Sequence, residues 1–305
     1  MEKIMLGVSG LSVPPVAVGC MRIGGMDRKT AEEFVSASLD LGFNFFDHAD
    51  IYGGGKCEEV FGDVLKTDAS MRDKIFIQTK CGIRSGMYDF SKEHILKAVD
   101  GSLKRLGTDY IDVLLLHRPD TLMEPEEVAE AFAKLKSEGK VNHFGVSNQK
   151  PGQMELLAKY LGTPIVANQL QFAPTNTGMV DTGFNVNTAF DGAVDRDGSV
   201  LEYCRLNDIT IQAWSPYQYG FFEGAYIGSD KWPELNKALD TVAEKYGITS
   251  TGAVTSFILR HPAKMMVVTG TTKPSRLAEI KAGADIRITR EEWYKIYLSA
   301  GNRLP

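Results

Sequence analysis

The sequence predicts a (β/α)₈ barrel, in which eight parallel strands close into a ring and helices cover the outside. Eight short apolar runs alternate with segments whose apolar residues recur every three or four positions. The runs are apolar at consecutive positions, as expected of parallel strands covered on both faces. Eight such units in 305 residues fit the size of this fold. The predicted strands are Val16–Cys20, Phe43–Asp47, Ile75–Lys80, Ile111–His117, Val141–Asn148, Ile165–Gln169, Ile209–Trp214 and Met265–Thr269.

The segments between these runs contain helix signals. Apolar residues from Leu235 to Tyr246 fall on one face of a helix, and Gly247 follows as a typical stop. Ser91 is expected to cap the helix after the third strand. Thr30 and Glu33 have the spacing of a capping box, which predicts that a helix starts at Thr30.

A doubly wound sheet is the main alternative to the barrel. Such a sheet often has the pattern G-x-G-x-x-G directly after its first strand. Here the first strand is followed by Cys20–Gly25, which lacks that pattern. No boundary between two domains stands out, so we expect residues 1–305 to form one barrel domain.

Two stretches depart from the regular alternation. Lys3–Val8 and Leu11–Val13 flank Ser9-Gly10, so we expect a β-hairpin that closes the N-terminal end of the barrel. The second stretch, Phe172–Asp197, is rich in Thr, Asn, Gly and Asp. A connection of this length in a compact domain is usually a functional loop or a disordered one.

The composition argues against several classes of partner. With 34 basic and 39 acidic residues the formal charge is −5, which disfavours nucleic acids and anionic membranes. No run of eighteen apolar residues and no signal-peptide core occurs, so we expect a cytoplasmic protein. The four cysteines lack metal-binding spacing, and we expect buried thiols and no metal site. The oligomeric state stays open, with a monomer favoured.

Four side chains with acid–base chemistry lie at neighbouring strand ends. Asp47, Lys80 and His117 end the second, third and fourth strands, and Tyr52 follows Asp47 by five residues. Alone, each has an ordinary structural explanation, such as a helix cap, an ion pair or core packing. In a barrel, however, the carboxyl ends of the strands meet at one mouth, where active sites are found. We therefore predict that these four residues form a catalytic site.

This set of side chains suits the reduction of a carbonyl group. A free phenol has a pKa near ~10, and a nearby ammonium group lowers it by favouring the phenolate. Asp47 would hold Lys80 charged beside Tyr52, and His117 would donate a hydrogen bond to the carbonyl oxygen. None of these side chains can supply hydride, so the reaction would need a nicotinamide cofactor.

The later strand ends suit such a cofactor. Ser147, Asn148 and Gln169 place hydroxyl and amide groups at the mouth. Trp214 and Ser215 follow on the next strand, where the indole offers a face on which a flat ring could stack.

The loop after the eighth strand has the features of a phosphate site. The loops after strands seven and eight of a barrel often bind phosphate at a helix N-terminus. Thr271, Lys273 and Arg276 lie there, and Pro274 fits the first turn of a helix. A capped surface helix is the alternative interpretation of this loop.

These motifs together resemble the aldo-keto reductase superfamily over essentially the whole chain. The matching segments are FFDHADIYGGG, the Lys80 strand end, LLLHRPD, GKVNHFGVSN, ANQ, AWSP and GTTKPSRLAE. The sequence around Asp47 and His117 is similar to that of a bacterial branch of predicted oxidoreductases. The resemblance implies a (β/α)₈ barrel that binds NADP(H) without a Rossmann fold and reduces a small-molecule carbonyl substrate.

The resemblance also implies a role for each matching residue. Tyr52 would be the general acid, Lys80 and Asp47 would tune it, and His117 would orient the carbonyl group. The residues that would hold the cofactor are Ser147, Asn148 and Gln169 at the carboxamide, Trp214 and Ser215 beside the ring, Thr271, Lys273 and Arg276 at the phosphates, and Arg276 with Glu279 at the adenosine.

Two features depart from the family pattern or add to it. Many members have Lys-Ser where this chain has Gly270-Thr271, so the 2′-phosphate contact rests on fewer groups. We still expect NADPH rather than NADH. Arg118 directly follows His117, which leads to the hypothesis that it favours anionic carbonyl substrates.

Two other functions remain open from the sequence. One is a nicotinamide-binding sensor or regulatory subunit with little turnover, which would keep the barrel and the cofactor. The other is a Schiff-base lyase built on Lys80. The lyase would leave Tyr52, Trp214 and the loop after the eighth strand unexplained.

Overall fold

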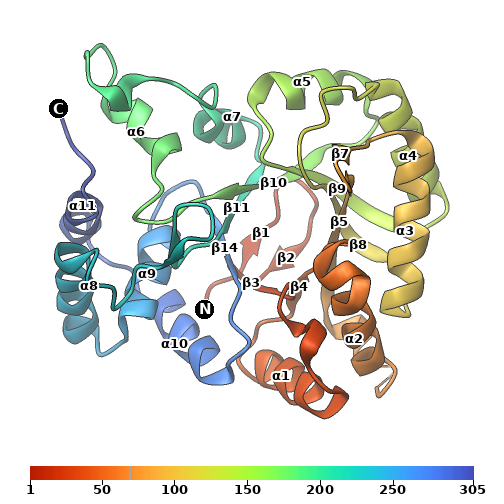
Figure 1. Ribbon diagram of the computed structural model, residues 1–305, viewed down its shortest axis with the longest axis horizontal. Helices are drawn as coiled ribbons and strands as arrows, with labels where there is room; N and C mark the ends of the chain where they lie inside the picture. Colours follow the sequence, from red (N-terminus) through yellow and green to blue (C-terminus); the bar gives the residue numbers. More distant parts are fainter. Residues whose placement is uncertain (69) are drawn as a thin grey trace.

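Eight parallel strands form a closed barrel at the centre of the molecule, as predicted (Figure 1). The computed structural model describes residues 1–68 and 70–305. The order around the barrel follows the chain, and the last strand pairs with the first. Each predicted run overlaps one strand, and the boundaries differ by at most two residues. The barrel strands are β3 (Val16–Gly19), β4 (Phe45–Asp47), β5 (Phe76–Cys81), β8 (Ile111–Leu116), β9 (Val141–Ser147), β10 (Ile165–Gln171), β11 (Thr210–Trp214) and β14 (Met266–Thr269).

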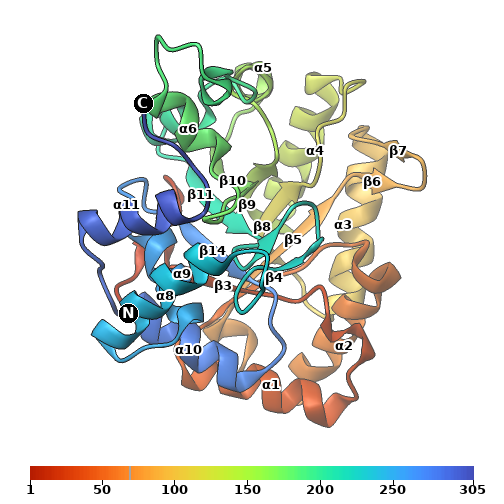
Figure 2. The ribbon, with the colours of Figure 1, turned by 60° about the vertical axis from the view of Figure 1, so that its left-hand side comes forward.

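Helices surround this barrel in both ribbon views (Figures 1 and 2). Gly247 ends α8 in the left-handed conformation, and the Ser91 hydroxyl accepts a hydrogen bond from the first turn of α3, both as predicted. The helices are α1 (Arg28–Asp40), α2 (Lys56–Leu65), α3 (Lys92–Leu106), α4 (Pro125–Ser137), α5 (Pro151–Tyr160), α6 (Gly178–Phe184), α7 (Val200–Leu206), α8 (Pro233–Tyr246), α9 (Ser250–Leu259), α10 (Pro274–Ala284) and α11 (Arg290–Ser299).

The predicted capping box at Thr30 is wrong. Helix α1 begins one turn earlier, and its N-cap is Asp27, whose carboxylate accepts a hydrogen bond from the Thr30 amide at 2.8 Å. A carboxylate at this position also interacts favourably with the positive end of the helix dipole, which explains why Asp27 takes the cap.

The N-terminal hairpin closes the barrel at the end opposite the carboxyl ends of the strands. Strands β1 (Ile4–Met5) and β2 (Ser12–Val13) pair in antiparallel fashion. Leu6 and Val13 are fully buried against side chains that fill the lower barrel interior, such as Val113. The Gly7 amide also donates a hydrogen bond to the Thr210 hydroxyl at 2.7 Å, which attaches the hairpin to β11.

The segment Phe172–Asp197 contains helix α6 and a short 3-10 helix, Asp191–Ala193, and it is not wholly irregular. The Tyr297 hydroxyl of α11 donates to the Asp181 carboxylate at 2.7 Å. Phe184 packs against the rings of Trp293 and Tyr297. These contacts anchor α6 to the C-terminal helix. The helix is only seven residues long and contains Gly178 and Gly183, which are poor helix formers, so the sequence pattern did not reveal it.

Two further hairpins follow barrel strands at their carboxyl ends. Strands β6 (Ile83–Arg84) and β7 (Met87–Tyr88) follow β5, and strands β12 (Gln218–Tyr219) and β13 (Gly224–Ala225) follow β11. Among the described residues, no helix is long and apolar enough to span a membrane, and no cluster of side chains suits a metal ion. The four cysteines are buried free thiols.

Close packing of two glycines sets the position of α10. A Cβ atom on Gly283 would lie 2.1 Å from the carbonyl oxygen of Gly252 in α9, so the two helix backbones touch. The N-terminus of α10 follows the loop that was predicted to bind phosphates. The distance between α9 and α10 therefore matters for that loop.

We predict that Gly283→Ala destabilises the fold by about 1–3 kcal/mol, because α10 must move away from α9. The matched control is Gly152→Ala in α5, where a Cβ atom meets nothing within 4 Å. That change should stabilise the protein by about 0.4–1 kcal/mol. Denaturant unfolding of both variants measures the difference, and equal effects would contradict the packing argument.

Candidate active site

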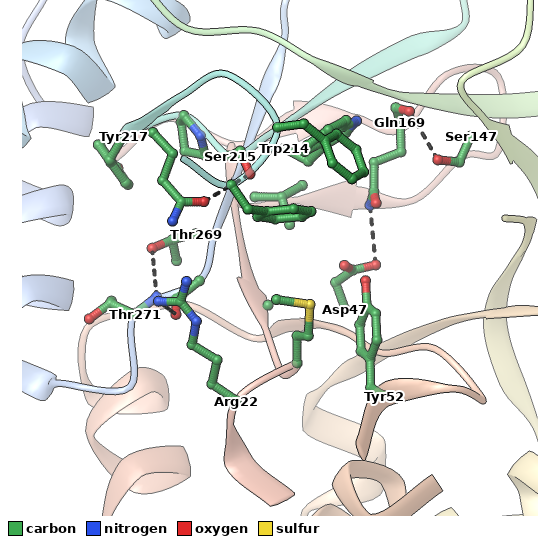
Figure 3. A pocket seen from close by; sticks show the side chains of 18 of the residues that line it. Arg22, Asp47, Tyr52, Ser147, Gln169, Trp214, Ser215, Tyr217, Thr269 and Thr271 are labelled. Atoms are coloured by element: carbon green, nitrogen blue, oxygen red, sulfur yellow. Dashed lines mark hydrogen bonds between the residues drawn. The ribbon is translucent and has the colours of Figure 1, made fainter. Parts of the chain in front are cut away.

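A cavity of about 690 Å³ opens at the carboxyl ends of the barrel strands. Its lining includes Tyr52, His117 and Trp214, and Asp47 lies at its floor (Figure 3). Met21 and Tyr88, from the connections after β3 and β5, also line the cavity. No residue of the polar segment 172–197 is among the described ones that line it. The anchoring of this segment on α11 explains why.

The floor of the cavity is built around the Lys80 ammonium group. The Lys80 side chain is fully buried and donates to the Asp47 Oδ2 atom and the His48 carbonyl oxygen, each at 2.8 Å. It also donates to the Tyr52 hydroxyl at 3.1 Å. The structure thus brings together Asp47, Tyr52 and Lys80 as the strand ends predicted.

Glycines after Tyr52 let the chain turn tightly into α2. Gly53, Gly54 and Gly55 all have positive φ angles, between 59° and 93°. At Gly55 a Cβ atom would also come within 2.9 Å of the Arg105 side chain. The turn fixes the direction of the Tyr52 ring, which points at Asp47 in Figure 3.

His117 completes the predicted group of four. Its ring lies edge-on to the Tyr52 ring, with 5.9 Å between centroids. The His117 amide donates to the Cys81 carbonyl oxygen at 2.9 Å, which holds the residue beside β5. The Nδ1 atom is buried and has no hydrogen-bond partner among the described residues.

Four of the predicted cofactor residues form one connected unit. The Ser147 hydroxyl donates to the Gln169 carbonyl oxygen at 3.1 Å, and the Asn148 amide group donates to the Ser147 hydroxyl at 2.7 Å. The Trp214 indole N–H donates to the Asn148 Oδ1 atom at 3.2 Å. This chain of bonds fixes the indole at the cavity wall beside the polar side chains.

Backbone strain occurs at two of the predicted cofactor residues. Asn148 and Ser215 have φ angles of 57° and 49°, in the left-handed region that few non-glycine residues adopt. Strain of this kind costs on the order of 1–3 kcal/mol and is concentrated at functional sites. Both residues follow the end of a barrel strand, so the strain directs their side chains at the cavity mouth.

The predicted phosphate loop meets the cavity only in part. Thr271 and Arg276 line it, as does Ser215 after β11, whereas Lys273 and Glu279 are not among the described lining residues. Lys273 is the N-cap of α10, and the Glu279 carboxylate accepts a hydrogen bond from the Thr249 hydroxyl at 3.3 Å.

Sequence reasoning missed several residues of the site. Arg22 lines the cavity and donates to the Gly270 carbonyl oxygen at 3.4 Å, so it lies beside the loop before α10. Gln78 and Gln212 lie beneath the floor and bind Asp47 and Gln169. Strand alternation could have found both, because each lies two residues before a predicted site residue on the same strand face.

The donor groups of the cavity fit a nicotinamide dinucleotide. Amide and hydroxyl groups at the floor match a carboxamide, and the Trp214 indole matches an aromatic ring. Arg22, Arg276 and the N-terminus of α10 match anionic phosphates.

Comparison with known proteins decides the family. The model of the aldo/keto reductase family matches residues 15–297. The chain belongs to the aldo-keto reductase family. It is similar to the uncharacterized oxidoreductase YcsN of Bacillus subtilis, with 36% identity over 97% of each chain. It is 34% identical to a 6-dehydroglucose reductase of Novosphingobium aromaticivorans over 98% of this chain and 96% of that one. A thermostable aldo-keto reductase crystallised with the inhibitor epalrestat superimposes with a TM-score of 0.79 at 25% identity, over 98% of this chain and 100% of that one.

The electrostatics of this aldo-keto reductase site differ from the sequence expectation at Tyr52. Burial raises the pKa of the Tyr52 phenol above its ordinary value and outweighs the lowering by the Lys80 ammonium. Lys80 lowers the pKa of Tyr52 as expected, but the effect of burial was not anticipated from the sequence and is larger. The phenol consequently stays protonated at neutral pH.

Burial also keeps His117 neutral. Removal from water, together with the charges of Lys80 and Arg118, holds the pKa of the imidazole well below its ordinary value. Burial alone would lower the pKa of Lys80, but the Asp47 carboxylate and the Tyr52 hydroxyl raise it. The site thus contains a neutral phenol, a neutral imidazole and a charged ammonium group.

A partly buried carboxyl group, that of Asp50, lies behind the Tyr52 turn. Burial and the neighbouring Glu58 carboxylate raise the pKa of Asp50 to about 7, against the opposing effect of Arg105. Its Oδ1 atom has no partner among the described residues, and its backbone N–H donates to the Lys80 carbonyl oxygen at 3.0 Å. Because the pKa of Asp50 is higher in the folded state than in the unfolded state, folding takes up a proton. The free energy of unfolding therefore falls as the pH rises from about 4 to about 7.

We predict that Asp50→Asn raises the stability at pH 8 by about 1–3 kcal/mol and has little effect near pH 4. The control is Asp89→Asn, for which we expect the opposite effect on stability. At Asp89, burial raises the pKa, but hydrogen bonds from Ser91 and Arg84 outweigh it and lower the pKa to about 2. Removing that carboxylate should destabilise the fold at neutral pH. Thermal unfolding across this pH range tests both, and a pH-independent effect of Asp50→Asn would contradict the assignment.

Proposed function

We propose that the protein is an NADPH-dependent reductase that converts an aldehyde or ketone to the alcohol. The contact of the buried Lys80 ammonium with both Asp47, at 2.8 Å, and Tyr52, at 3.1 Å, is the observation that supports it best. Such a group holds a phenol where it can protonate an oxygen at the cavity floor. Reductase and oxidoreductase names among the relatives support the same class of reaction.

Tyr52 is the proton donor in this mechanism. Since the Lys80 ammonium donates to its oxygen, the phenol hydrogen is free to point into the cavity. The substrate carbonyl oxygen lies between the Tyr52 hydroxyl and the neutral His117 imidazole, which donates a hydrogen bond. The cofactor, when bound, supplies hydride to the carbonyl carbon. As the C=O bond opens, the oxygen takes the phenol proton, and Lys80 stabilises the phenolate until solvent returns a proton.

Ser147, Asn148 and Gln169 hold the carboxamide of the cofactor, and Trp214 and Ser215 cover its ring. Arg22, Thr271 and Arg276 bind its phosphates, which favours NADPH over NADH through charge. Lys273 and Glu279 remain candidates for its adenosine end, although in this structure they lie outside the cavity lining.

We predict that Tyr52→Phe lowers kcat for carbonyl reduction by about 10²–10⁴-fold, because the proton donor is lost. The dissociation constant of NADPH should stay within about twofold, since Phe retains the ring. Absorbance of the reduced nicotinamide follows turnover on a panel of aldehydes and ketones, and fluorescence quenching follows binding. Full activity of the variant would rule out this mechanism. Tight NADPH binding by the wild type without turnover on any carbonyl would favour the sensor function.

Arg118 selects substrates with an anionic group near the carbonyl. Its guanidinium lines the cavity, 5.6 Å from the centroid of the Trp214 ring and 5.7 Å from that of Phe221. No ion pair to Arg118 occurs within residues 1–68 and 70–305. A guanidinium that packs against two aromatic rings and has no ion-pair partner among the described residues is a receptor for a carboxylate or phosphate.

We predict that Arg118→Gln lowers kcat/KM for 4-carboxybenzaldehyde by about 10–100-fold, the loss expected for a hydrogen bond to a charged group. The matched substrate is methyl 4-formylbenzoate, which has the same ring and no charge, and it should change by less than about threefold. Arg118→Lys, which keeps the charge, should retain part of the preference. Equal loss for both substrates in the Gln variant would contradict this role.

A further inference from the structure

Three glutamine side chains and Asp47 fill the barrel interior at the floor of the cavity, where Asp47 and Gln169 line it and Gln78 and Gln212 lie beneath. They come from register-paired positions, because Asp47 of β4 pairs with Gln78 of β5, and Gln169 of β10 pairs with Gln212 of β11. Gln78 and Gln212 are completely buried. Barrel interiors are usually filled by branched apolar side chains, as the layer below is here. A layer of amides at this height therefore requires an explanation.

Hydrogen bonds join the four side chains into one closed group. The Asp47 Oδ1 atom accepts from Gln78 Nε2 at 2.6 Å and from Gln169 Nε2 at 3.2 Å. The same two nitrogen atoms donate to Gln212 Oε1, at 2.8 and 3.0 Å. Gln212 Nε2 returns a hydrogen bond to Gln78 Oε1 at 2.9 Å.

The Asp47 carboxylate determines the direction of every bond in this group. An ionised carboxylate only accepts, so Gln78 and Gln169 must both present their nitrogen atoms to it. Each of those nitrogens also reaches Gln212, which must then present its oxygen. Both N–H groups of Gln169 are thereby used inside the barrel, which leaves Oε1 as the atom that Gln169 offers to the cavity.

The same group also separates the two oxygen atoms of Asp47. Oδ1 is occupied by the glutamines, so Oδ2 is left to Lys80 at 2.8 Å. The position of the ammonium group beneath Tyr52 follows from this division. Rotation of the Asp47 carboxylate would break its hydrogen bonds with Gln78 and Gln169, so these two glutamines restrain its orientation.

We infer that Gln78 and Gln212 are positioning residues that fix which atom Gln169 presents to the cofactor and which oxygen Asp47 presents to Lys80. This inference rests on the proposed function, in which Gln169 binds the nicotinamide carboxamide. A carboxamide NH₂ group is the partner that suits Gln169 Oε1. An apolar pair in place of Gln78 and Gln212 removes both partners of their two mutual hydrogen bonds, which is nearly neutral. Asp47 Oδ1 keeps the bond from Gln169, whereas one N–H group of Gln169 loses its partner, so we expect a folded variant that is less stable by about 1–3 kcal/mol.

The test is the double variant Gln78→Leu/Gln212→Leu, with equilibrium binding as the first measurement. NADP⁺ is compared with its 3-acetylpyridine analogue, which lacks the amide NH₂ donor. The wild type should bind NADP⁺ about tenfold more tightly, the worth of one hydrogen bond. The double variant should lose at least about threefold of this preference, because Gln169 is no longer held in one orientation. Turnover is the second measurement, and kcat should fall by about 10–100-fold as Lys80 and Tyr52 lose their fixed geometry.

Gln149→Leu is the matched control, because Gln149 is also a buried glutamine but takes no part in these bonds. It should change neither the binding preference nor kcat. Gln212→Met, a smaller change, is measured as well in case the double variant fails to fold, and it should show both effects in weaker form. Folded variants with both quantities within about twofold of the wild type would overturn the inference. A wild type without turnover, but with a binding preference that the variants lose, would support the positioning role and contradict the proposed reduction.

Discussion

The buried Lys80 ammonium group is the interaction on which the rest of the site depends. An ammonium has three hydrogens, and here all three are donated, to Asp47, to the His48 carbonyl and to Tyr52. A buried charge without partners costs several kcal/mol, so none of these contacts can be lost cheaply. The barrel supplies the carboxylate partner because β4 and β5 are adjacent and paired, which places Asp47 on the strand next to that of Lys80. The Tyr52 turn then completes the set.

Burial in this arrangement acts on Tyr52 and His117 in a direction that suits proton transfer. It raises the pKa of the Tyr52 phenol and lowers that of the His117 imidazole, and both changes favour the neutral form. In the proposed mechanism, a neutral phenol keeps the proton that it delivers, and a neutral imidazole donates a hydrogen bond without placing a second cation beside Lys80. Lys80 lowers the pKa of Tyr52 against the larger effect of burial, because the ammonium group stabilises the phenolate form.

The sequence was sufficient for the barrel and for the contact of Asp47, Tyr52 and Lys80, because strand ends in a parallel barrel converge whatever the loops do. It was insufficient for the net pKa of Tyr52, which depends on how much of the cavity excludes water. The sequence analysis also missed Gln78 and Gln212, although strand alternation places both on the inner face. A single polar residue in a short apolar run does not indicate a site until the residues to which it hydrogen-bonds are known. The α1 cap was misplaced since Asp27 and Thr30 both have capping side chains and the spacing alone does not decide between them.

Charge is distributed in the cavity in a way that the composition conceals. The chain as a whole is acidic, with a formal charge of −5. Among the described residues that line the cavity, however, the charged ones are Arg22, Arg118, Arg276 and Asp47, and Lys80 neutralises Asp47 from below. The side chains that line the cavity therefore carry a net positive charge, although the chain as a whole is acidic. A cleft of this kind concentrates anionic ligands at its mouth and strengthens each charged contact as water leaves. The net charge of the chain therefore indicates that nucleic acids and anionic membranes are disfavoured as partners. The charges of the few side chains that line the cavity determine which small ligands bind there, and they favour anions.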